Sequence, residues 1–292
     1  MSAFTRVFRT ALFELASALR SRRAVVTVLL FALIGAGVMY ATVSVFSTME
    51  EQVVSMLGLP VAENPGGVTM TLWRSPFFKS IMAKALGSSL LFDDMLRQHP
   101  VAIAFGFFLF AVMPVMTLIT CAPTAAGEIR AGSVRYVLLR VSRTEWTFGL
   151  FFAEALVLLA AMLLLAVAAS VVAVWRLPEW SALAFLPALF VWALRAWVSS
   201  LAWLGICTGV SLCVRSPGKA TGLSLLAFAL TVVFGFLSDR WSPLFGFLRP
   251  QGYELALWRS SSAVVFEGVV GTLTLAFLYL GLGGAVFARR DV

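Results

Sequence analysis

Six long apolar runs constrain this chain more than any other feature of its sequence. A helix needs about 20 mostly apolar residues to cross the hydrocarbon core of a bilayer. Runs of about this length lie at residues 24–46, 101–123, 148–174, within 182–214, 220–237 and 263–287. Of the 292 residues, 61% are hydrophobic and 12% are charged, which is about half the charged share of a soluble domain (~25%). The sequence therefore predicts an all-α polytopic membrane protein, in which residues 24–292 form a single transmembrane domain of six helices.

The basic residues are distributed unevenly among the connections between these runs. Most of them fall in the amino-terminal segment 1–23, the 124–147 connection, the short connection after residue 214 and the carboxyl-terminal tail. Lys and Arg are retained on the cytoplasmic side of a membrane, so we expect both termini to be cytoplasmic. The net charge of +8 then follows from membrane orientation, and we expect no nucleic-acid partner.

The amino-terminal segment 1–23 has a pattern of its own. Apolar side chains recur at steps of three and four residues, with Arg, Thr, Glu and Ser between them. The apolar positions are Phe4, Val7, Phe8, Ala11, Leu12, Leu15 and Leu19. This spacing predicts an amphipathic helix that lies in the cytoplasmic membrane interface before the first span. A simple basic anchor is the alternative.

Two connections on the outer side are long enough to contain structure of their own. In the 47–100 connection, residues 60–67 have the composition of a turn, and apolar positions at helical spacing follow over residues 73–97. We expect one or two short helices there, which either shape an exit vestibule or form a structural cap. The 238–262 connection contains Trp, Tyr and Pro, which predicts a re-entrant or interfacial segment.

The sequence lacks the motifs of the common enzyme classes. A phosphate-binding loop requires G-x-x-x-x-G-K-[ST], and the nearest match, around Lys219, has Cys213 at the first glycine and Ala220 at the hydroxyl position. His99 is the one histidine, and the three cysteines have no metal-like spacing. We therefore expect no enzyme activity, no metal and no cofactor in this chain. An intramembrane enzyme site built from scattered residues is the alternative.

Three ionisable residues fall inside predicted spans: Glu154, Arg195 and Glu267. A charge at the centre of a membrane helix costs about 2.5–3.5 kcal/mol on the insertion scale, so such residues face protein or water. Two interpretations stay open. The three residues line a path for a polar substrate or ion, or Arg195 forms an internal ion pair with Glu154 or Glu267 that fixes helix packing.

The connection after the second span, within residues 124–147, is the most informative segment. Glu128 stands where this span leaves the membrane, Gly132 and a short mixed helix follow, and a Ser142-Arg143 turn leads almost directly into the third span. This pattern indicates a short, charged hairpin held rigidly between two spans, which is able to transmit a push from a cytoplasmic partner. The alternative is a plain connection whose arginines contact anionic headgroups.

This segment resembles the permeases of ABC transporters of the type-2 exporter class. In those proteins the second span ends in a pattern similar to G-E-x-x-x-G-[TS]-x-x-x-L-L-x-x-P-[VI]-[ST]-R, followed by a helix that begins near Gly-Lys. The matching residues are Gly127, Glu128, Gly132, Ser133, Leu138, Leu139, Ser142, Arg143 and Gly149. The chain departs from the pattern in lacking the proline before the turn, in a shorter spacing after the leucines and in having Leu150 for the lysine. The tail, residues 287–291, is also similar to a family ending, Phe-x-Arg-Arg-Asp.

The resemblance implies a function and a set of partners. Two permease chains, identical or paralogous, would form an exporter in the plasma (inner) membrane, with an accessory protein on the outer side in some members. Each would dock on a separate ATP-binding subunit, which binds the ATP and magnesium. The resemblance places the docking surface at Glu128, Gly132, Ser133, Arg135, Arg140, Ser142 and Arg143 of the connection and at Arg6 and Arg9 of the amino-terminal helix.

Two other functions stay open beside the permease. An ion-coupled secondary transporter would use Glu154, Arg195 or Glu267, and it would be expected to contain paired broken helices in related halves. A membrane scaffold or assembly factor would need neither a substrate nor an ATPase partner. A separate ATP-binding subunit is the feature that distinguishes the permease from both.

Overall fold

The computed structural model describes residues 3–20, 22–57, 98–176 and 182–290. All regular secondary structure in these ranges is helical, which confirms the predicted fold class. The helices, in chain order, are α1 (Ala3–Arg20), α2 (Arg23–Leu57), α6 (Pro100–Cys121), α7 (Thr124–Ala131), α8 (Ser133–Leu138), α9 (Arg143–Arg176), α10 (Ala182–Leu212), α11 (Pro217–Arg240), α12 (Leu244–Phe247), α13 (Pro250–Leu257) and α14 (Ser262–Ala288).

Six helices in the described part of the chain are long and apolar enough to cross a membrane, and a further helix, α1, precedes them. The candidate spans are Ala24–Met49, Pro100–Ala131, Arg143–Arg176, Leu186–Leu212, Pro217–Ser238 and Ser262–Ala288. Each contains or overlaps one of the apolar runs, and the second, Pro100–Ala131, extends beyond its run through α7. The agreement follows from the length criterion, because a run that must cross the bilayer has to satisfy its backbone hydrogen bonds within one helix.

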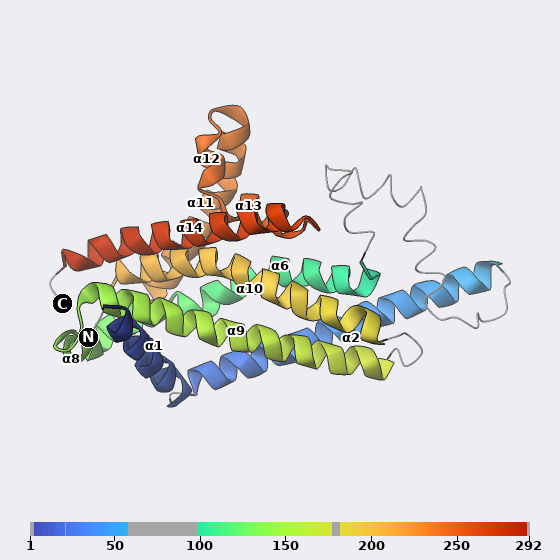
Figure 1. The fold of residues 1–292 in the computed structure, drawn as a ribbon, viewed down its shortest axis with the longest axis horizontal. Helices are drawn as coiled ribbons and strands as arrows, with labels where there is room; N and C mark the ends of the chain where they lie inside the picture. Colours follow the sequence, from blue (N-terminus) through green and yellow to red (C-terminus); the bar gives the residue numbers. More distant parts are fainter. Residues whose placement is uncertain (1–2, 21, 58–97, 177–181, 291–292) are drawn as a thin grey trace.

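The core lies around α9 and α10. Helix α9 packs against α2, α1 and α10, and α10 packs in addition against α14 and α6. These long helices run in roughly the same direction as the longest axis of the molecule (Figure 1). Trp146 of α9 and Trp192 of α10 are both fully buried. Both chain ends lie at the same end of the bundle as α8 (Figure 1).

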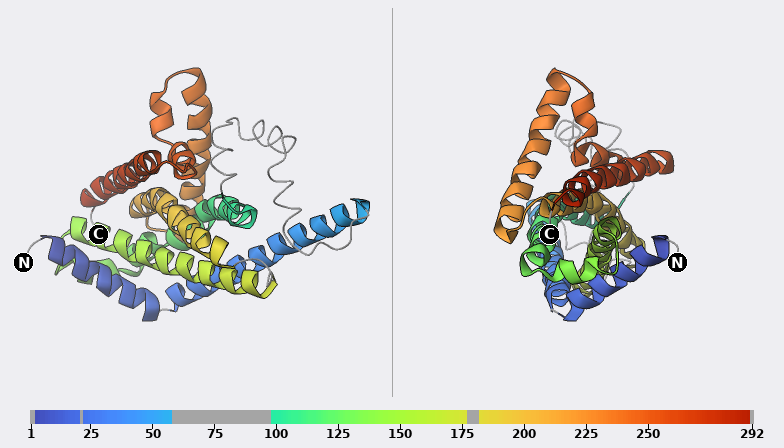
Figure 2. Two further views of the ribbon diagram at one scale, coloured as in Figure 1. Left: turned by 45° about the vertical axis from the view of Figure 1, so that its right-hand side comes forward. Right: turned by 90° about the vertical axis from the view of Figure 1, so that its left-hand side faces the viewer.

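Helix α11 is the exception to this arrangement. It leaves the bundle at a steep angle and carries α12 away from the other helices (Figure 2). Helix α13 then returns and packs against α14 and α10. Leu225, Leu226 and Phe236 of α11 are more than half exposed, so this helix presents a large apolar surface to lipid or to another subunit.

The helix boundaries differ from the sequence prediction at the outer connection. Helix α2 continues through residues 47–57, which we assigned to the outer loop, because no glycine or proline interrupts this stretch before Gly58. The short helices predicted within residues 73–97 lie outside the described residues. In the 238–262 connection, the structure shows two short helices, α12 and α13.

Candidate functional site

Helix α7, at the end of the second candidate span, and α8 form a hairpin before the third span, and we call residues 124–142 the α7–α8 hairpin. Gly132 separates the two helices with a φ of 73°, in the left-handed region, where glycine avoids the cost that a side chain would impose. The Ser133 hydroxyl donates a hydrogen bond to the carbonyl of Glu128 at 3.1 Å. Gly132 and Ser133 of the predicted set therefore build the turn itself.

Residues 135–142 of the hairpin, on α8 and after it, present large side chains to the exterior, and we call them the hairpin tip. Tyr136 is 77% exposed and Leu139 is 83% exposed. Beside them is an open hollow of about 460 Å³, which is lined by Arg135, Leu138, Leu139, Val141, Ser142 and Arg143. Arg140 is exposed next to it. The tip thus combines positive charge with apolar surface, which is the composition of a protein interface rich in anchor residues.

The first turn of α9 is held by a capping box. The amide of Ser142 donates to the Glu145 carboxylate at 2.9 Å, and the amide of Glu145 donates to the Ser142 hydroxyl at 3.2 Å. This reciprocal pair satisfies amides that the start of a helix leaves without partners. The pattern Ser142-x-x-Glu145 is a sequence signal for the helix start that the prediction of this boundary did not use.

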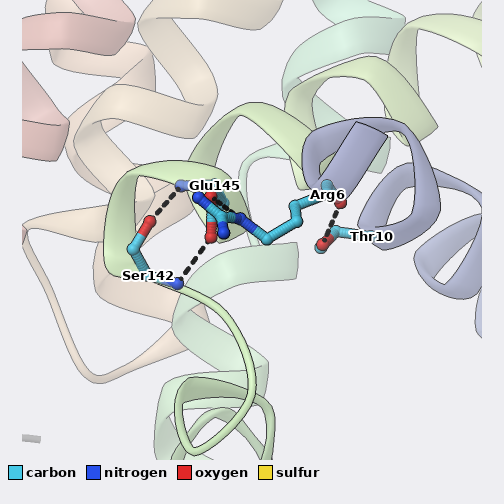
Figure 3. A network of polar contacts seen from close by, with 4 residues as sticks. All are labelled: Arg6, Thr10, Ser142 and Glu145. Carbon is cyan, nitrogen blue, oxygen red and sulfur yellow. Dashed lines mark hydrogen bonds and ion pairs between the residues drawn. The ribbon is translucent and has the colours of Figure 1, made fainter. Parts of the chain in front are cut away.

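Helix α1 is fastened to this same turn (Figure 3). The Arg6 guanidinium forms an ion pair with Glu145 at 2.5 Å, and Thr10 donates to the Arg6 carbonyl. At the next residue of α9, the Trp146 indole donates to the Glu14 carboxylate at 3.1 Å. Arg6 therefore contacts the start of α9, next to the end of the α7–α8 hairpin.

Helix α1 packs on α9 with its small and polar side. The side that packs on α9 consists of Thr10, Ala11, Glu14 and Ala18, whereas Phe4, Phe8, Leu12 and Leu19 are exposed. A Cβ at Gly149 of α9 would overlap the Thr10 side chain, so the two helices meet closely at this glycine. The apolar stripe that contains Phe4 and Phe8 therefore faces away from the bundle, as in a helix that lies in a membrane interface.

Glu128 faces inward, toward two other carboxylates. Glu14, Glu128 and Glu154 line one cavity of about 180 Å³ between α1, α7 and α9. Glu154 also accepts a weak hydrogen bond from the thiol of Cys121 at 3.6 Å. Among the described residues, no group of His, Cys, Asp and Glu has the arrangement of a metal site.

Arg195 does not contact either of its expected partners among the described residues. Its guanidinium donates to the Leu257 carbonyl at 2.9 Å and lies 5.2 Å from the centre of the Trp192 ring. Glu154 faces the cavity beside α1, and Glu267 is exposed on α14. The proposed ion pair is therefore replaced by a cap on α13, because the rotation of α10 directs Arg195 toward that helix.

A partly buried carboxylate on α13 was not singled out by the sequence analysis. Glu254 of α13 accepts hydrogen bonds from the Ser199 hydroxyl at 2.8 Å and the Trp203 indole at 3.0 Å, both on α10. Burial raises the pKa of this carboxyl above its ordinary value, and the two hydrogen bonds partly oppose that shift. The signal was a lone acidic residue among apolar neighbours in a connection already predicted to be re-entrant.

The comparison with protein families agrees with the architecture. The family model of ABC-2 family transporter proteins matches residues 10–246, from the middle of α1 into α12. A search of curated proteins found no match. Permeases of this family are membrane components that lack a nucleotide-binding domain of their own and associate with ABC ATP-binding subunits. With most of its length matched and six candidate spans, this multi-pass membrane protein belongs to the ABC-2 transporter family.

Proposed function

We propose that this chain is the membrane-spanning permease subunit of an ATP-driven exporter and that its ATP-binding subunits dock on the α7–α8 hairpin. The supporting observation is the tip of that hairpin, where Tyr136 and Leu139 are exposed beside a hollow lined in part by Arg135. Aromatic and Arg side chains are the usual anchors of protein interfaces. Arg140 on the hairpin and Arg9 on α1 are both exposed and add positive charge.

The hairpin is suited to transmit a displacement because its ends are held. Helix α7 follows α6 after a two-residue connection, and the capping box fixes the start of α9. In the proposed cycle the ATP-binding subunits bind ATP and magnesium, close on each other and displace the hairpins. The motion passes to the spans of two permease chains, a second copy or a paralogue completing the path.

The same proposal sets the location of the protein. Both termini and the hairpin lie at one end of the bundle, and the basic residues of that end are retained on the cytoplasmic side of the plasma (inner) membrane. The outer end is then free for cargo release and for an accessory protein. Outward transport is the direction that the family resemblance favours.

Co-purification tests docking directly. The tagged chain is extracted in mild detergent from cells that express it with its ATP-binding subunit, and the eluate is assayed for that subunit and for ATP hydrolysis. We expect equal stoichiometry for the unaltered chain and a loss of the subunit in Leu139→Ser. The matched control is Leu244→Ser on α12, where a leucine with 71% exposure lies far along the chain from the hairpin.

A second variant tests coupling separately from docking. Glu128→Ala is expected to retain the ATP-binding subunit and its hydrolysis while transport is lost, because Glu128 lines the cavity between α7, α1 and α9. Transport at the unaltered level in this variant would remove the coupling role. A chain that elutes without any ATPase would instead support an ion-coupled carrier or a scaffold, and Glu154 would be the next residue to change.

A further inference from the structure

Arg143 points to the end of another helix. Its Nη1 atom lies within hydrogen-bond distance of three carbonyl oxygens, those of Phe287 at 3.0 Å, Ala288 at 2.8 Å and Arg290 at 2.5 Å, and its two N–H groups are shared among them. Its guanidinium also lies 5.7 Å from the centre of the Phe287 ring. The last carbonyls of a helix have no partner within that helix and carry partial negative charge. Arg143 therefore caps the carboxyl end of α14.

Arg290 makes the same kind of contact with a third helix. Its Nη1 atom donates to the carbonyl of Leu212 at 3.1 Å, and Leu212 is the last residue of α10. Arg143 binds the backbone of Arg290, and Arg290 binds the end of α10, so the two arginines form a chain of caps. This chain joins the start of α9 to the ends of both α14 and α10.

The helices joined in this way are packed tightly along their length. A Cβ at Gly205 or Gly209 of α10 would overlap the backbone of α14, and a Cβ at Gly283 of α14 would overlap the backbone of Gly209. Backbones in such close contact move together rather than sliding past each other. A displacement delivered to the end of α14 therefore reaches α10 as well.

We propose, on the basis of the function proposed above, that Arg143 and Arg290 are positioning residues that carry displacement of the α7–α8 hairpin to α14 and α10. The hairpin leads directly into Arg143 at the start of α9. The hydrogen bonds of Arg143 and Arg290 link this end of α9 to the carboxyl ends of α14 and α10. Arg143 then acts by binding other helices of this chain. Arg140, exposed on the same hairpin, is placed to contact the ATP-binding subunit.

The test separates docking from transmission in the complete transporter. Spin labels are attached through Leu33→Cys on α2 and Leu282→Cys on α14, both of which are well exposed, in a chain whose three native cysteines are replaced by alanine. The labelled permease with its ATP-binding subunits is placed in lipid nanodiscs. The distance between the labels is measured by electron spin resonance with and without ATP and magnesium, together with ATP hydrolysis and subunit stoichiometry.

The two arginines and Arg140 are expected to differ in these measurements. In Arg290→Ala, the subunit stays bound and hydrolyses ATP, but the ATP-dependent change in distance is lost. Arg143→Ala loses the change in distance as well. Arg290→Lys retains part of the change because lysine still donates to the Leu212 carbonyl. Arg140→Ala weakens subunit binding, and the permease that remains bound keeps the change.

Several results would overturn the proposal. An unaltered distance change in both alanine variants would show that the caps are not needed for transmission. Loss of the subunit in Arg143→Ala would show that this residue docks, and Arg290→Ala, which leaves the hairpin intact, gives an independent answer if Arg143→Ala fails to fold. If the unaltered chain carries no ATP-binding subunit, the function proposed above fails, and the transmission role fails with it. If the distance change is unaltered in both alanine variants, or if Arg143→Ala loses the subunit, the proposed function stands and only the transmission role fails.

Discussion

Glu254 illustrates how buried polar groups in this protein are satisfied by a neighbouring helix. It is on the short helix α13, yet both of its hydrogen-bond donors, Ser199 and Trp203, belong to α10. A buried carboxyl without such donors would be costly. The residue therefore links the α12–α13 connection to the centre of the bundle.

The raised pKa of Glu254 leads to a dependence of stability on pH. The folded state holds this proton more tightly than the unfolded chain, so the stabilisation is complete below the ordinary pKa of 4.5 and is lost as the pH rises through the folded value. Glu254→Gln keeps an acceptor for both donors but does not titrate. We expect its melting temperature to exceed that of the unaltered chain increasingly as the pH rises to neutrality, measured by fluorescence-detected size exclusion. Parallel curves for the two proteins would contradict this.

Arg195 leads to a second prediction for single residues. Its hydrogen bond to the Leu257 carbonyl connects α10 to the end of α13, and a hydrogen bond to a charged group contributes about 1.5–3 kcal/mol. We expect Arg195→Ala to lower the melting temperature and the yield of folded protein in detergent. Glu267→Gln is the control, since Glu267 is exposed on α14. An equal defect in both variants would restore the ion pair that the sequence suggested.

At the scale of helices, the contact between α10 and α14 depends on glycines that have no room for a side chain. Gly205 and Gly209 form a G-x-x-x-G pair, a spacing that is frequent in membrane helices. The structure adds Gly283, which meets the backbone of Gly209 directly. The pair is therefore completed by a third glycine from the facing helix.

Two glycines of α14 provide a matched test of this contact. A Cβ at Gly283 would overlap the Gly209 backbone, whereas a Cβ at Gly281 meets no atom within 4 Å. Gly283→Ala is expected to destabilise the protein by about 1–3 kcal/mol through overpacking. Gly281→Ala is expected to stabilise it by about 0.5–1 kcal/mol, because alanine favours a helix over glycine. Thermal unfolding in lipid nanodiscs measures both, and equal effects would argue against the close approach.

The amino-terminal helix α1 shows which part of a helical pattern is ambiguous. Its apolar stripe indicated an amphipathic helix, and the helix is present. The apolar stripe did not reveal that α9 would pack on the opposite, small and polar side of α1, through Thr10, Glu14 and Arg6. An apolar face fits both a protein core and a membrane interface, so periodicity alone does not choose between them.

At the scale of the whole molecule, the two chain ends and the α7–α8 hairpin gather at one end of the bundle, and the far end of α9 lies at the other (Figure 1). Helix α11 stands apart with its apolar side chains exposed (Figure 2). Such a surface is stable only when lipid or another apolar surface covers it. The proposed pairing with a second permease chain is consistent with this shape.

The orientation of the molecule is testable by labelling. Leu139→Cys on the hairpin and Trp175→Cys near the end of α9 place single, well-exposed thiols at opposite ends of the bundle, in a chain whose native cysteines are replaced. A maleimide that does not cross membranes is expected to label Trp175→Cys in intact cells and Leu139→Cys only after the cells are opened. The reverse pattern would place the termini outside and exclude docking of cytoplasmic ATP-binding subunits.

The sequence by itself determined the six spans, the helix before them and the segment that carries the family resemblance. These features depend on local properties, because bilayer thickness sets the length of an apolar run and glycine marks the turn at Gly132. The family match over residues 10–246 agrees with that reading. The docking and path roles of the residues that the resemblance selected stay predictions.

Only the tertiary structure decided which polar groups meet. Arg143 caps α14, Arg195 caps α13 in place of an ion pair, and Glu254 is a partly buried acceptor. Their partners are far apart in the sequence, and the rotation and tilt of each span select them. Those angles follow from close packing, such as Gly283 against Gly209 and Gly149 against Thr10. Because every span must be apolar to cross the bilayer, the pattern of apolar residues does not show how each span is rotated.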